Sequence, residues 1–195
     1  MPNYPTHARW GRGGAVLAAI AVGAVVYVQF GMIPLSVAAA AGAGIAAFVG
    51  AIFPDIDHHA SIPRQKAVRG LQGLVVAGVA AAAGLRVETL VGAAETAVTE
   101  VGTGVPAAAV AAGGVGLAAV ALVGAVDPTI GLVTRKHRGW THSVAVTFGL
   151  AAVLAAGAVG LTLELGLAEQ VSAVAVVGAF YAGILIHLGL DGEIV

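Results

Sequence analysis

Six long stretches of this chain carry no charged side chain, and this feature constrains the fold more than any other. A helix needs about 20 largely apolar residues to cross a bilayer, and five of the stretches have close to that length or more. The third is the shortest and has to borrow length from its charged flank near Arg69. The six stretches are residues 13–30, 33–53, 71–85, 105–126, 144–163 and 171–190. They predict an all-α fold, a multi-pass transmembrane helical bundle with about six spans.

The composition excludes several classes of protein. Hydrophobic residues make up 59% of the 195 residues and charged residues only 10%, whereas a soluble domain has roughly a quarter of its residues charged. The net charge of −1 excludes a nucleic-acid binder held by a basic surface. With no cysteine, disulfides, iron–sulfur clusters and Cys-ligated zinc are excluded as well. No Pro-rich linker divides the chain, so we expect a single integral-membrane domain over residues 1–195.

The segment between the third and fourth stretches has a different pattern. Residues 86–104 carry Val87, Leu90 and Val91 at helical spacing, with Glu88 and Glu95 elsewhere around the helix. This pattern predicts an amphipathic helix on the membrane surface.

Small residues dominate the spans. Because small side chains let helix backbones approach closely in lipid, five glycines are predicted packing sites: Gly42, Gly44, Gly113, Gly114 and Gly116. The alternative is a compositional bias with no packing role.

The distribution of positive charge predicts the orientation. If all six stretches span, both termini and the loops at 54–66 and 127–143 share one side of the membrane. Eight of the nine Lys and Arg residues lie on that side: Arg9, Arg12, Arg64, Lys66, Arg69, Arg135, Lys136 and Arg138. The positive-inside rule makes that side cytoplasmic. The alternative, that the first stretch is a cleaved signal peptide, would break this parity.

All six histidines fall on the predicted cytoplasmic side, in three short motifs and one isolated position. The first motif, 54–59 (Pro-Asp-Ile-Asp-His-His), places two carboxylates and two imidazoles at the lipid boundary. The second, 137–143, has His137 and His142 around Arg138, with Thr141 or Ser143 available to cap the next helix. In the third, His187 and Asp191 are four residues apart and share a helical face. The isolated histidine is His7.

This donor set indicates a metal site. Imidazole and carboxylate without sulfur suit Zn, Mn or Fe, or a site for two metal ions, and such sites activate water at neutral pH. The predicted ligands are His58, His137, His142, His187, Asp55 and Asp191, with His7 and Asp57 as lesser candidates. Arg138 is the predicted catalytic residue, because its guanidinium is suited to holding the oxyanion of a phosphoester. Two alternatives remain: a solvated polar loop at 54–59, and a buried His187 bonded only to a backbone carbonyl.

At these residues the chain resembles the membrane-bound, metal-dependent hydrolases of the YdjM type, also described as LexA-binding inner-membrane-associated hydrolases. The shared elements are an early His (His7), Pro-Asp-x-Asp-His (54–58), His-Arg-Gly-x-Thr-His-Ser (137–143) and a late His-x-x-x-Asp (187–191). The resemblance implies a multi-pass membrane protein and a metal-dependent hydrolase.

The function expected from motifs and resemblance together is hydrolysis of a phosphoester or related ester at the cytoplasmic face. Its substrate would be lipid-linked or phosphorylated and would reach the site from the membrane lipid or the cytosol, and no nucleic acid is expected as a partner. The alternative is a non-catalytic metal-binding membrane protein: a sensor, a carrier or a scaffold for a soluble partner. Carriers generally place polar residues near the midplane of several spans, whereas these spans are apolar until their cytoplasmic ends.

Overall fold

The computed structural model describes residues 4–134 and 139–193, and all regular structure in this part of the chain is helical. The predicted residues His137 and Arg138 lie outside the described residues. The elements are α1 (Tyr4–Phe30), α2 (Ile33–Ile52), the short 3-10 helix η1 (Pro54–Asp57), α3 (Ile62–Leu85), α4 (Val87–Val101), α5 (Ala107–Val133), the 3-10 helix η2 (Trp140–His142), α6 (Val144–Leu161) and α7 (Leu167–Asp191).

The all-α prediction is confirmed, and six of these helices are long and apolar enough to cross a membrane: α1, α2, α3, α5, α6 and α7. The helix that contains the third predicted stretch is longer than the stretch itself, because α3 begins at Ile62 and has 24 residues. Its first turns also carry Lys66 and Arg69, whose charged ends can reach the headgroup region while their stems stay in the apolar layer. α1 likewise begins at Tyr4, well before the apolar stretch, so that His7 belongs to the helix.

The amphipathic segment is also helical as predicted. α4 begins after Arg86 and is followed by Gly102, whose φ of 68° is in the left-handed region that favours glycine at a helix C-cap.

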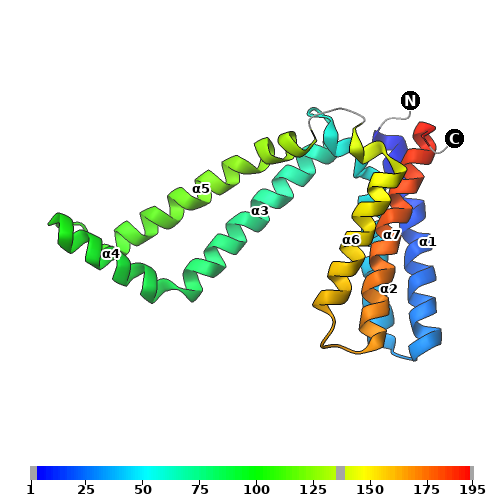
Figure 1. The fold of residues 1–195 in the computed structure, drawn as a ribbon, viewed down its shortest axis with the longest axis horizontal. Coiled ribbons are helices and arrows are strands. Elements are labelled where there is room, and N and C mark those ends of the chain that lie inside the picture. Colours follow the sequence, from blue (N-terminus) through cyan, green and yellow to red (C-terminus); the bar gives the residue numbers. More distant parts are fainter. Residues whose placement is uncertain (1–3, 135–138, 194–195) are drawn as a thin grey trace. The chain divides into compact units, whose positions relative to one another are not determined.

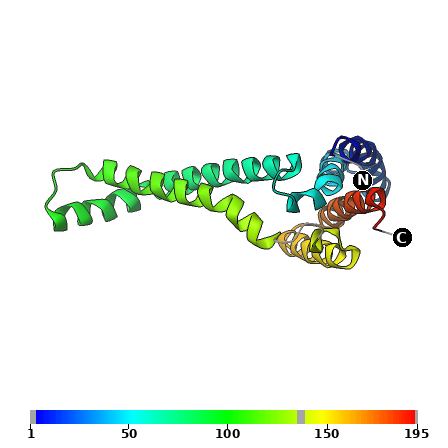
Figure 2. The ribbon, with the colours of Figure 1, turned by 90° about the horizontal axis from the view of Figure 1, so that it is seen from above.

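The chain divides into two compact units, each described by itself. The first unit comprises Met1–Arg64 and Thr134–Val195, and the second comprises Gln65–Val133. In the first unit, α1, α2, α6 and α7 run side by side (Figure 1), and Figure 2 shows the same four helices nearly end on. Its apolar centre is Ala43, Ala47 and Ala179. The second unit contains α4, α5 and most of α3, and in it Gln72 Nε2 donates to Val123 O at 3.2 Å.

Glycines set the closest helix approaches of the first unit. A Cβ on Gly42 would lie 3.1 Å from Val176 Cγ2, and one on Gly44 would lie 3.2 Å from Ala15 O, so these two predicted packing sites are confirmed. A Cβ on Gly50 would overlap the backbone of Phe180, and one on Gly183 would overlap the backbone of Ala47. The tightest contact is therefore between α2 and α7.

The prediction was wrong for three glycines of α5. Within the described residues nothing lies within 4 Å of a Cβ built at Gly113, Gly114 or Gly116. Small residues permit close packing but do not specify which helix approaches. In the first unit the approach occurs on α2 and α7 instead.

Both described chain ends lie with η1 and η2 at one end of the first unit (Figure 1). Every element of this unit that carries a predicted metal ligand therefore reaches the same end of the four helices.

Candidate metal centre

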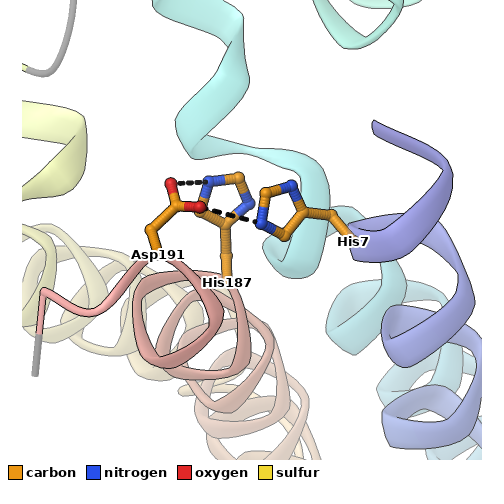
Figure 3. A group of neighbouring side chains, drawn as sticks. All are labelled: His7, His187 and Asp191. Carbon is orange, nitrogen blue, oxygen red and sulfur yellow. Dashed lines mark ion pairs between the residues drawn. The ribbon is translucent and has the colours of Figure 1, made fainter. Parts of the chain in front are cut away.

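The late motif and the early histidine form the centre of the site. His187 and Asp191 are on the last turns of α7, and His7 is at the end of the first turn of α1 (Figure 3). Asp191 Oδ1 lies 3.2 Å from His7 Nε2, and Asp191 Oδ2 lies 3.4 Å from His187 Nε2. The two imidazole rings stack with their centroids 3.9 Å apart. One ligand atom from each of the three residues lies within 4.8 Å of the other two, close enough to bind one ion.

Four polar atoms of this group are buried without a hydrogen-bond partner: both ring nitrogens of His7, His187 Nε2 and Asp191 Oδ1. The exposed fraction of the whole residue is 2% for His7 and 0% for His187. Leaving a buried polar atom unpaired costs about 1–3 kcal/mol, and more when the group is charged. A cation among these atoms would remove that cost, so the residues present fit a metal ion.

His187 is oriented by α2. Its Nδ1 lies 2.9 Å from Ala51 O, and because a carbonyl can only accept, Nδ1 carries the proton. Nε2 is then left with a lone pair directed at Asp191 and Asp55, which is the tautomer a metal ligand needs. The alternative for His187 was a hydrogen bond to a backbone carbonyl and no metal. That hydrogen bond is present, but it uses only Nδ1 and leaves Nε2 available.

The turn after α2 adds Asp55. Pro54 is the first residue of η1, and this short helix directs Asp55 toward both histidines. Asp55 Oδ2 lies 3.7 Å from His7 Nδ1, and Asp55 Oδ1 lies 3.8 Å from His187 Nε2. Burial opposes ionisation of Asp55, but its contact with His7 and the attraction of the neighbouring imidazoles outweigh that effect and lower its pKa below the usual value. Asp55 is therefore a carboxylate at neutral pH.

Asp57 orients His142. Asp57 Oδ2 lies 3.4 Å from His142 Nδ1 and accepts a hydrogen bond from Thr141 Oγ1 at 3.1 Å. Both residues are buried, and the opposite ring nitrogen, His142 Nε2, lies 3.7 Å from Asp191 Oδ2. A carboxylate behind a histidine that points its other nitrogen into the site is the usual support for a metal-ligating imidazole. In this geometry Asp57 therefore contacts and orients His142, whereas the sequence suggested it as a lesser candidate ligand.

The helix cap after the second motif is Ser143. Its hydroxyl accepts from Val146 N at 3.4 Å, whereas the Thr141 hydroxyl is used on Asp57. Of the two predicted caps, only Ser143 has that role.

The family follows from the whole chain. A family model described as the YdjM inner membrane protein matches residues 5–192. The chain belongs to the YdjM inner membrane protein family. The match includes every residue of the site described above, and with the six apolar helices it makes this chain a multi-pass membrane protein. No curated protein and no solved structure matches the chain.

The predicted residues of this YdjM-family protein fall into three groups. The structure brings together His7, Asp55, His142, His187 and Asp191 as possible ligands, with Asp57 behind His142. It places His58 in an exposed position directly after η1. His137 and Arg138 are the two that lie outside the described residues.

Two polar residues of the YdjM-family site went unrecognised in the sequence. Arg64 is only 2% exposed and donates to Ile56 O, between the two carboxylates of η1. Ser61 donates to Asp55 O. The sequence signal was a Ser-x-x-Arg that closely follows Pro-Asp-x-Asp-His. By sequence alone Arg64 does not differ from the other positive charges on the predicted cytoplasmic side.

Aromatic rings join the two motif turns. The Phe53 ring lies edge-on to Trp140, with centroids 6.0 Å apart, and edge-on to Phe180 at 5.4 Å. Such pairs hold η1, η2 and α7 together beside the polar cluster.

Proposed function

We propose that this YdjM-family protein is a metal-dependent hydrolase of a phosphoester or related ester, with its site at the cytoplasmic end of the first unit. The observation that carries the proposal is the set of buried His and Asp atoms without hydrogen-bond partners. Such atoms are rare in folded proteins unless an ion or water pairs with them.

The residues that would hold the metal are His7, His142, His187, Asp55 and Asp191. A mixture of imidazole and carboxylate suits Zn, Mn or Fe, and five donors leave room for a second ion. A divalent ion bound there would supply a Lewis acid and a water that ionises near neutral pH.

The other residues would prepare this set. Asp57 and the Ala51 carbonyl hold His142 and His187 in the required orientation. Arg138 would bind the oxyanion of the substrate, because a guanidinium offers a planar fork of donors. His137, next to it, stays a proposed ligand, whereas the exposed His58 is left out of the proposed set.

The different roles of His142 and Arg138 provide the test. We expect His142→Ala to lower metal content, because it removes a bond to the ion, and Arg138→Ala to keep metal but lose at least ten-fold in hydrolysis rate. Metal would be measured in detergent-purified protein, and hydrolysis with bis(p-nitrophenyl) phosphate. Loss of metal from Arg138→Ala would make its role structural and remove the argument for a phosphoester. Full metal content without hydrolysis of any ester by the wild type would favour a sensor or scaffold.

The proposed side of the membrane has its own test. The chain has no cysteine, so single cysteines at exposed positions report on sidedness. We choose Ala60, between η1 and α3, and Thr96 on α4. In intact cells a membrane-impermeant thiol reagent should label Thr96→Cys and leave Ala60→Cys unlabelled, while both should react after permeabilisation. The reverse pattern would place the site outside the cytoplasm.

A further inference from the structure

The turn that carries Asp55 and Asp57 is held by two side chains that come from the start of α3. Ser61 Oγ donates to Asp55 O at 2.6 Å, and Arg64 donates from its guanidinium NH1 to Ile56 O at 3.3 Å. Two successive backbone carbonyls of η1 are thus occupied by side chains.

These two side chains are themselves fixed. Ser61 Oγ accepts from the backbone N–H of Arg64 at 3.1 Å, which is the N-cap bond of α3. The guanidinium of Arg64 also donates to Thr134 Oγ1 at 3.2 Å, and both of these residues are buried. The start of α3, η1 and Thr134 therefore form one hydrogen-bonded unit.

The backbone of η1 determines which histidine each carboxylate meets. Asp55 points to His7 and His187, whereas Asp57 points to Thr141 and His142. Ile56 is the residue between the two aspartates. A change of its backbone angles would therefore turn one carboxylate away from its partners.

We propose that Ser61 and Arg64 are positioning residues of the metal site, which bond the backbone of η1 and thereby aim Asp55 and Asp57 at different histidines. The effect on metal binding rests on the proposed function, whereas the bonds that hold the turn do not. Neither residue belongs to the proposed ligand set. A guanidinium is suited to this position because it stays charged and holds several donors in a fixed plane.

Ser61→Ala is the most direct test, because it removes both bonds of the hydroxyl and no bulk. We expect the affinity for Zn²⁺ to fall about 10–100-fold, the range typical of residues that orient metal ligands. Ser61→Thr keeps the hydroxyl and should stay within about three-fold of the wild type on the same basis. Arg64→Lys keeps the charge but loses the planar fork, and it should weaken binding as Ser61→Ala does. Affinity would be measured in detergent by competition with a chromogenic chelator.

The matched control is Ser172→Ala. Ser172 is a buried serine within α7, and its hydroxyl donates to one backbone carbonyl, Ala168 O at 2.7 Å, near the start of the helix and far along it from His187. Its loss should leave Zn²⁺ affinity unchanged. A purely structural role for Ser61 predicts that both alanine variants lower thermal stability alike and neither changes affinity.

Hydrogen exchange in metal-free protein separates this inference from the proposed function. The amides of Ile56 and His58 are bonded to Phe53 O and Asp55 O within the turn, and they should exchange faster in Ser61→Ala than in the wild type or Ser172→Ala. Unchanged exchange would overturn the inference, as would a wild-type affinity in Ser61→Ala. If the wild type bound no metal, faster exchange would still support control of the turn by Ser61, while the proposed function would fail.

Discussion

Gly183→Ala should strongly destabilise the protein, whereas Gly178→Ala on the same helix should not. A Cβ at Gly183 would overlap the backbone of Ala47 and lie 2.8 Å from Ala51 N, whereas a Cβ at Gly178 meets nothing within 4 Å. Overpacking a close contact costs about 1–3 kcal/mol, and the upper end applies here because backbone atoms cannot rotate away. At Gly178 the alanine should be neutral or add up to about 1 kcal/mol through helix propensity. The measurement is the free energy of unfolding in detergent.

The same substitution should also reduce metal binding. Gly183 allows α7 to approach α2, and that approach brings His187 Nδ1 to the Ala51 carbonyl. If the helices separate, the carbonyl no longer fixes the tautomer of His187. Equal stability and equal Zn²⁺ affinity in Gly183→Ala and Gly178→Ala would show that the close approach is not required.

Chelation should lower the melting temperature of the wild type, and the double variant His187→Leu, Asp191→Asn should lose most of that response. The ion would join α1, η1, η2 and α7, so its binding free energy would add to folding free energy. At a free metal concentration 1,000 times the Kd this amounts to about 4 kcal/mol. Gly178→Ala serves as the control and should respond to chelator as the wild type does.

The opposite result has a definite meaning as well. If the Ala51 carbonyl alone satisfied His187, chelator would not change the melting temperature of the wild type. His187→Leu could then stabilise the protein, since an apolar side chain would replace a costly polar one. That pattern would remove both residues of the late motif from the proposed ligands.

The spans could be predicted because hydropathy alone decides which segments can cross a bilayer. The gathering of the motifs also followed from the sequence, since an even number of spans brings both loops and both termini to one side. The sequence did not predict which glycines lie at close contacts between helices. Gly113 and Gly183 are equally small, and only the packed structure distinguishes the open position from the one against a backbone.

The roles within the first motif depended on local backbone geometry. η1 turns Asp55 and Asp57 toward different histidines, and the chain then becomes extended at His58, with φ −95° and ψ 116°. His58 is exposed in this structure, although the sequence favoured it over Asp57 as a ligand. The buried position of Arg64 could not be predicted either, because a hydropathy scale gives every arginine the same strongly polar value whether it is exposed or buried.

Elemental analysis of the detergent-purified wild type, beside the double variant His187→Leu, Asp191→Asn, tests the central claim most directly. The account predicts at least one equivalent of Zn, Mn or Fe per chain in the wild type and a clear loss in the variant. A wild type that contains none of these metals, even after growth with each of them added, would contradict the assignment of the buried His and Asp cluster as a metal centre.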